Sequence, residues 1–111
     1  MVDDMISDER IENALDFLVT TAREVGVLAE QAKLAEHYVK HVKALEMKKW
    51  NEQSVSAQER EACASENYLK AIVNDAKAAG ALRELMSRRE AAETTISAWQ
   101  TMVKAAQGPR P

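Results

Sequence analysis

The chain has little of what builds sheets, covalent cross-links or sharp turns. It holds one cysteine, two prolines and three glycines in 111 residues, and only 5% of its residues are aromatic. A single cysteine, Cys63, excludes an internal disulfide and is typical of a reducing cytosol. Both prolines lie in the last three residues, so no proline interrupts a helix before Pro109. The residues that remain are rich in alanine, leucine, glutamate, lysine and glutamine, which favours helix over strand.

Long hydrophobic runs and a large charge excess are missing as well. No apolar run approaches the ~20 residues needed to span a bilayer. The N-terminus is acidic where a signal peptide would be basic and then apolar. The net charge of −3 does not favour nucleic acid by itself, and it leaves room for a local basic face. We therefore expect a soluble, cytoplasmic protein with no membrane contact and no cofactor.

Apolar residues in the first half of the chain recur at alternating steps of three and four. An α-helix turns once in 3.6 residues, so this spacing gathers them on one stripe that must pack against another helix. The pattern predicts a helix over residues 8–50, with the stripe slipping by one position after Ala32. The stripe consists of Ile11, Leu15, Leu18, Ala22, Val25, Ala29 and Ala32.

A polar stretch over residues 51–56 predicts the turn between two long helices. Ser56 and Glu59 fit a capping box at the start of a second helix over 57–106. The apolar stripe of this second helix shifts by one position near Gly80. Two interpretations are open at this point: one kinked helix, or a break that gives a third helix. Continuity is favoured because alanines surround the glycine and no polar turn accompanies it. The stripe includes Ser65, Leu69, Ile72, Leu85, Arg89, Ile96 and Trp99.

A short turn between long helices predicts an all-α fold, namely a long antiparallel helical hairpin of the coiled-coil type. We expect one helical domain over 1–107 and a disordered tail over 108–111. With the turn near Gln53, residue i faces roughly residue 106 − i, which places Val42 near Ala64. The same alignment gives Arg89 an acidic neighbour near Glu12 and Asp16. Because alanine buries little area per side chain, we expect the hairpin to complete its burial as a homo-oligomer.

Basic side chains and histidines gather toward the end of the first predicted helix. Such a face can follow the phosphates of a nucleic acid, with an affinity that falls steeply as salt rises. Trp50 lies where it can stack on a base, and Arg60 adds a charge at the start of the second helix. The plainer interpretation is a solvated helix face. The candidate contacts are Lys33, His37, Lys40, His41, Lys43, Lys48, Lys49, Trp50 and Arg60.

Metal binding and catalysis receive less support. His37 and His41 lie four residues apart, a spacing that suits a shared metal ion, and Cys63 lies opposite in the expected hairpin. Two histidines without a dedicated third ligand are weak evidence, so we assign no metal site. No triad-like arrangement and no glycine-rich phosphate loop is present in the sequence, so we expect a protein that is not an enzyme.

Two segments carry a resemblance to a known group of proteins. The run Ala57-Gln58-Glu59-Arg60-Glu61-Ala62-Cys63-Ala64-Ser65-Glu66-Asn67-Tyr68, followed by Leu82 to Lys104 with Ile96 and Trp99, resembles short all-helical proteins of tailed bacteriophages and prophages. Members of that family look like A-E-R-E-A-x-A-x-x-S-x-x-Y and then I-x-x-W-R-S. Here Gln100-Thr101 replaces the arginine and serine, and Gly80 departs from the pattern.

The resemblance covers residues 56–104 and implies a phage origin. Genes of this family are often neighbours of phage recombination genes, which implies an accessory role in DNA recombination or replication. Single-stranded DNA, a phage recombination protein and further copies of the chain are the implied partners. The alternative is a protein-interaction module, a scaffold or an inhibitor of a host factor, with no DNA binding.

Overall fold

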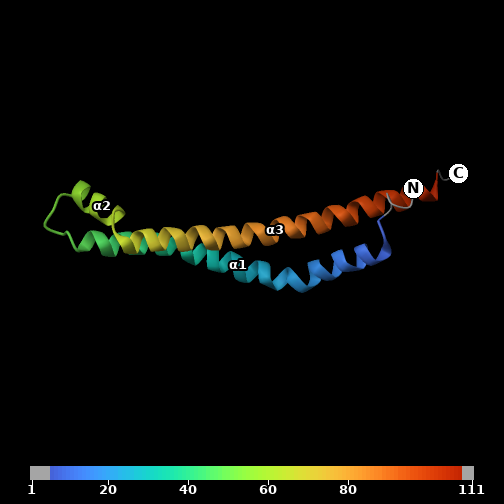
Figure 1. Cartoon of the computed structure of the whole chain (residues 1–111), viewed down its shortest axis with the longest axis horizontal. Coiled ribbons are helices and arrows are strands. Elements are labelled where there is room, and N and C mark those ends of the chain that lie inside the picture. The colour runs from blue at the N-terminus through green and yellow to red at the C-terminus, as the bar shows by residue number, and fades with distance from the viewer. Residues whose placement is uncertain (1–5, 109–111) are drawn as a thin grey trace. The chain divides into compact units, whose positions relative to one another are not determined.

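The computed structural model of the chain describes residues 6–108. It contains three helices, α1 (Asp8–Lys48), α2 (Val55–Cys63) and α3 (Glu66–Gln107). No strand occurs among these residues (Figure 1). The predicted all-α helical hairpin is therefore confirmed. Of the predicted tail over 108–111, the structure describes only Gly108, and the other three residues lie outside the described part.

The first long helix begins and ends close to the predicted residues. Ser7 caps α1, since its Oγ accepts a hydrogen bond from the Arg10 amide at 3.2 Å, and Asp8 and Glu9 place negative charge at the positive end of the helix dipole. The helix ends at Lys48 rather than at residue 50. Lys49 and Trp50 turn away in hydrogen-bonded turns closed by the carbonyls of Glu46 and Met47.

The predicted capping box at Ser56 is wrong, because Ser54 caps the second helix instead. Ser54 has extended dihedral angles, and its side chain accepts a hydrogen bond from the Ala57 amide. The side chain of Gln58 donates to the Gln53 carbonyl at 2.9 Å and ties this helix start to the preceding turn. These two bonds place the beginning of α2 two residues earlier than residue 57.

The second predicted helix is divided at Ala64 and Ser65, which the sequence pattern did not reveal. Ser65 Oγ donates to the Ala62 carbonyl at 2.8 Å and accepts from the Tyr68 amide at 3.1 Å. One hydroxyl therefore satisfies the end of α2 and the start of α3 together. The break considered at Gly80 does not occur. α3 is helical through Gly80, where a Cβ atom would meet nothing within 4 Å.

The contacts within the chain divide it into two compact units. The first unit comprises Met1–Val25 and Glu84–Pro111, and the second comprises Gly26–Arg83. Each unit pairs a segment of α1 with an antiparallel segment of α3, and the second unit also contains α2 (Figure 1).

The buried and half-buried positions at the contact between the helices alternate by three and four residues without interruption, so neither predicted slip occurs. The heptad seam of α1 consists of Ile11, Ala14, Leu18, Thr21, Val25, Leu28, Ala32, Ala35, Val39, Val42 and Glu46. The heptad seam of α3 consists of Tyr68, Ala71, Asp75, Ala78, Leu82, Leu85, Arg89, Ala92, Ile96 and Trp99. Leu15, Leu69 and Ile72, expected on the stripe, are 41–59% exposed in the single chain.

Arg89, a polar member of the α3 seam, makes hydrogen bonds across to α1. In the first unit, Arg89 Nη1 donates to the Leu18 carbonyl at 2.8 Å and to Thr21 Oγ1 at 2.6 Å. Thr21 Oγ1 in turn donates to the Phe17 carbonyl at 2.6 Å. The acidic partner expected for Arg89 is therefore wrong. Two neutral oxygens lie opposite the guanidinium, and the neighbouring Arg88 lies 5.0 Å from the centre of the Phe17 ring.

The predicted register holds within a few residues in the first unit and fails in the second. Leu18 and Phe17 meet Arg89 and Arg88, as the alignment around Gln53 implies. In the second unit, Val42 lines a groove with Asn67, Lys70 and Ala71, which lie further along the chain than its predicted neighbour Ala64. The nine residues of α2 form a separate helix between the two long ones. The residues of α3 that pair with α1 therefore lie further along the chain than they would after a single short turn.

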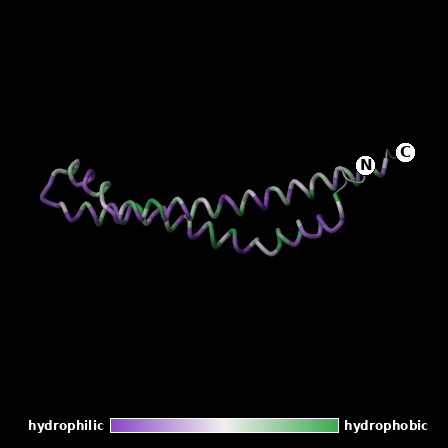
Figure 2. The backbone as a smooth tube through the Cα atoms, in the orientation of Figure 1, coloured by the Kyte–Doolittle hydropathy of each residue, from purple (hydrophilic) through white to green (hydrophobic). Residues whose placement is uncertain are grey.

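Hydropathy changes over short distances along both long helices (Figure 2). Neither α1 nor α3 contains a segment long and apolar enough to cross a bilayer, and the same holds for the rest of the described chain.

Candidate functional site

The basic side chains predicted to contact phosphates lie mainly on one face of α1 in the second unit. Lys33, His37, Lys40, His41 and Lys48 are all exposed, and we call them the basic face. At 100° per residue they fall within an arc of about 100°. The acids between Lys33 and Lys48 are Glu36 and Glu46, and neither lies within that arc. The arrangement is a strip of positive charge along about four turns of helix.

The ion pairs of this segment leave most of that charge open to solvent. Lys33 Nζ lies 3.6 Å from Glu36 Oε2, and both side chains are more than half exposed. Such a pair contributes little, ~0.3–0.5 kcal/mol. Among residues 6–108, Lys40 and Lys48 form no ion pair.

The other four predicted contacts lie apart from the basic face. Lys43 is half-buried on the flank of α1 that carries Glu36, and Lys49 is bound to Glu46. Trp50 lies in the turn after α1 and is 43% exposed. Arg60 is an exposed residue of α2. The structure therefore gathers five of the nine residues on one surface.

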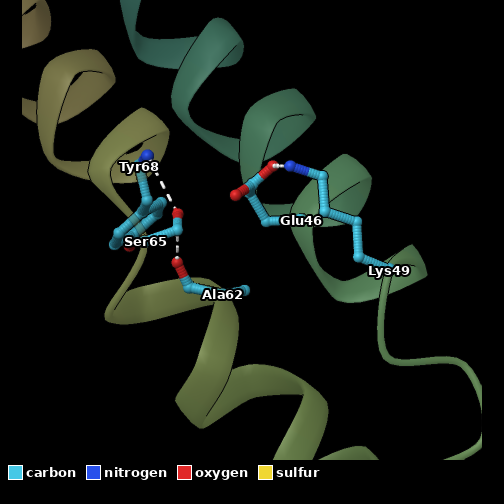
Figure 3. Close-up of polar contacts among 5 residues, drawn as sticks. All are labelled: Glu46, Lys49, Ala62, Ser65 and Tyr68. Atoms are coloured by element: carbon cyan, nitrogen blue, oxygen red, sulfur yellow. Dashed lines mark hydrogen bonds and ion pairs between the residues drawn. The ribbon is translucent and has the colours of Figure 1, made fainter.

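Glu46 is a carboxylate in the heptad seam, at the junction of α2 and α3. It is only 7% exposed. Lys49 Nζ lies 2.5 Å from Glu46 Oε2 (Figure 3). Ser65 and Asn67, on either side of the first residue of α3, lie near this carboxylate. Glu46 thus connects the end of α1 to the first residues of the returning helix.

These contacts set the titration of Glu46. The hydrogen bond from Lys49 lowers the pKa of Glu46 below its ordinary 4.5, and the contacts with Ser65 and Asn67 act in the same direction. Burial opposes them but is outweighed. Because the pKa is lower in the folded state, the ionised carboxylate stabilises the fold above the pKa of the unfolded chain. That stabilisation is lost as the pH falls through the folded-state pKa.

We expect Glu46→Gln to destabilise the protein at neutral pH and to flatten the acid limb of its stability profile. The stability difference from wild type should shrink as the pH falls below the ordinary glutamate pKa of 4.5 and Glu46 takes up a proton in the folded wild type. Urea unfolding at each pH measures it. Glu36→Gln, at an exposed carboxylate, is the matched control and should follow the wild-type profile. Parallel profiles for Glu46→Gln and wild type would contradict this assignment.

A second surface lies beside the basic face on the same helix segment. Val27, Leu34, Tyr38 and Leu45 are between 45% and 62% exposed, and we call them the apolar stripe. Leu34, Tyr38 and Leu45 form one wall of two neighbouring grooves, and the α3 wall carries Asn67, Lys70 and Asn74. The ring of Tyr38 lies 6.2 Å from that of His41. The apolar stripe was not among the predicted surfaces, although its spacing of seven and four residues is visible in the sequence.

The histidines do not belong to a larger metal-ligating group. No cluster of three histidine, cysteine, aspartate or glutamate side chains that could hold a metal ion occurs in the described part of the chain. Cys63 is exposed at the end of α2 and is unpaired within residues 6–108.

Comparisons with known proteins add no assignment. No protein-family model, no curated protein and no solved structure matches this chain.

Proposed function

We propose that this chain is a non-enzymatic accessory protein of a bacteriophage, which self-associates and contacts DNA phosphates through the basic face of α1. It acts in recombination or replication in the host cytoplasm, on single-stranded DNA or with a phage recombination protein. The observation that carries the proposal is the basic face itself, five exposed cationic or titratable side chains on one helix face without an acid among them.

The physical basis is electrostatic and independent of base sequence. Lysines spaced along a helix bind successive phosphates and release the counterions condensed on the strand. The two imidazole groups add hydrogen-bond donors. The exposed Trp50, in the turn after α1, provides a ring on which a base can stack. A net charge of −3 keeps the rest of the surface from attracting nucleic acid.

A salt titration of binding to a single-stranded oligonucleotide tests this proposal. The logarithm of the binding constant should fall linearly with the logarithm of salt, with a slope of about −0.7 per phosphate contact. The double variant Lys40→Glu and Lys48→Glu should lower the affinity at least about tenfold and reduce the slope by about 1.4.

The matched control reverses two exposed cations on α3 of the same unit, Lys77→Glu and Arg83→Glu. It changes the net charge equally and should keep most of the affinity. Equal losses for both double variants would attribute binding to net charge rather than to the basic face. No binding at low salt would remove the DNA contact altogether.

The second candidate function is a protein-interaction module that does not bind DNA. It is favoured by the apolar stripe, whose four large side chains are exposed in the single chain. Capture of one host protein by the immobilised chain, unchanged by nuclease treatment and lost on Tyr38→Asp, would support it over the first proposal.

A further inference from the structure

The apolar stripe belongs to a second heptad pattern on α1. Together with Gln31 and His41, its residues alternate by four and three positions. This is the spacing of a coiled-coil interface, and it lies beside the buried seam of the same helix. The members in order are Val27, Gln31, Leu34, Tyr38, His41 and Leu45. We propose that a second copy of this chain binds here, with the two α1 helices antiparallel around a two-fold axis level with residue 36.

The exposed area of the chain supports a partner of that size. The chain exposes 8620 Å², whereas a folded monomer of 12.4 kDa is expected to expose about 6,100 Å². The excess is about 2,500 Å², and a standard interface buries about 800 Å² on each partner. None of the described large side chains is fully buried in the single chain. Self-association on the apolar stripe would remove part of this excess.

The pattern is self-complementary only in the antiparallel orientation. A two-fold axis level with residue 36 places Val27 opposite Leu45 of the second copy, and Leu34 opposite Tyr38 of the second copy. Each pair joins apolar groups that are now in contact with water. The parallel orientation would place each residue beside itself, with Tyr38 against Tyr38 and His41 against His41.

The polar members also complement each other in this arrangement. Gln31 lies opposite His41 of the second copy, where an amide and an imidazole can exchange a hydrogen bond. Glu30 is exposed next to Gln31 and reaches the same histidine, which adds charge complementarity. The two symmetry-related polar layers among four apolar ones fix the register of the coiled coil. No lysine, arginine or acid occurs in the interface pattern itself.

The dimer deepens the proposed function, and this consequence rests on it. In an antiparallel pair His41 is enclosed in the interface, and the lysines of the two basic faces lie on the same side of it, so two rows of lysines border one surface. A single strand laid along them meets twice as many cations as one chain offers. Added salt should therefore have opposite effects on dimer formation and on DNA binding. It screens the repulsion between the two basic faces, and it weakens their contact with phosphates.

Mass by light scattering at increasing concentration tests the surface. Wild type should reach twice the chain mass of 12.4 kDa. Leu34→Asp should remain at the chain mass with unchanged helix content. Leu69→Asp is the matched control, because Leu69 on α3 is as exposed as Leu34, at 59% against 62%, and it should still dimerise. A wild-type monomer at all concentrations, or loss of the dimer only in Leu69→Asp, would overturn the proposal.

Cysteine cross-linking tests the orientation. In a Cys63→Ser background, Val27→Cys and Leu45→Cys chains should form a disulfide when mixed and none alone. In the antiparallel pair the two copies of residue 27 lie about 27 Å apart, while a disulfide requires Cα atoms within about 7 Å. Cross-linking of Val27→Cys with itself would show a parallel pair and contradict the model of the interface.

The two proposals fail separately. A cross-linked antiparallel dimer that binds no oligonucleotide would remove the DNA contact and leave the interface. Oligonucleotide binding by a chain that stays monomeric would remove the interface and leave the basic face. If both hold, Leu34→Asp should also reduce the salt slope of DNA binding, because only one basic face then meets the strand.

Discussion

Replacing Leu85 by alanine should lower the free energy of unfolding by about 2–4 kcal/mol. Leu85 lies in the heptad seam of α3 and is 6% exposed. Removing its three terminal carbon atoms loses their transfer free energy and leaves a cavity between α3 and α1 in the first unit. Most other buried apolar residues are alanines, so the seam has few large side chains that can repack into the space. Urea unfolding followed by circular dichroism measures the loss.

Leu69→Ala provides the control within the same helix. Leu69 is 59% exposed, so its truncation should change the free energy of unfolding by no more than about 0.5 kcal/mol. The two leucines thus distinguish the heptad seam of the structure from the stripe predicted from sequence, which contains both. Equal losses at the two sites would mean that Leu69 is buried as well, in the chain or in an oligomer.

Replacing Ala62 by aspartate should release α2 from the second unit. Ala62 has 0% exposure, and a charge cannot be buried there without a partner. α2 has nine residues, fewer than the roughly 12–15 that an isolated helix needs in water, so it should lose its helical structure when it undocks. Limited proteolysis should then cut between Trp50 and Ser65, at least tenfold faster than in wild type.

Ala64→Asp is the matched control for this change. Ala64 is exposed at the end of α2, so the same substitution two residues away meets solvent. Its cleavage rate should remain close to that of wild type. Rapid cleavage of both variants would mean that any negative charge near the α2–α3 junction opens the turn, whether or not it is buried.

Sequence patterning could not determine the phase of the coiled coil, that is, which residues of each long helix face the other helix. The seam contains Thr21, Glu46 and Arg89, and each one interrupts an apolar repeat. Beside it, exposed leucines and alanines form a second repeat that appears more hydrophobic. A pattern that counts apolar residues selects Ala22 in place of Thr21, although Thr21 is the buried residue of the two. Only the packed helices show that Arg89 finds oxygens of Leu18 and Thr21 opposite it.

The division of the second helix depended on a single hydroxyl. Ser65 occupied a seam position in the predicted pattern, and its helix propensity gave no reason to place a break there. In the structure its side chain serves both helix ends, with bonds to the Ala62 carbonyl and the Tyr68 amide. Ser54 was likewise overlooked, because Ser56 with Glu59 offered the more familiar capping pattern. Local hydrogen bonds decided both boundaries.

The candidate site, too, was predictable only where it depends on the spacing of residues along one helix. Lys33, His37 and Lys40 belong to one helix face, so their grouping follows from helical spacing and was predictable. Lys49 and Arg60 lie outside that helix, and their placement depended on where the turn and α2 begin. Glu46 received no role from the sequence, because its burial and lowered pKa arise from contact with residues of the returning helix.

The sequence by itself determined that the chain is helical, where its two long helices lie, and that a turn near Gln53 folds one back on the other. These properties follow from helix propensity, from the absence of proline and from spacing along a single helix, all of which are local. The tertiary structure alone decided which of two competing stripes is buried, where α2 ends and how α1 is aligned with α3. Those outcomes depend on contacts between residues far apart in the chain, such as the hydrogen bonds of Arg89 with Leu18 and Thr21 and the burial of Glu46 near the start of the returning helix.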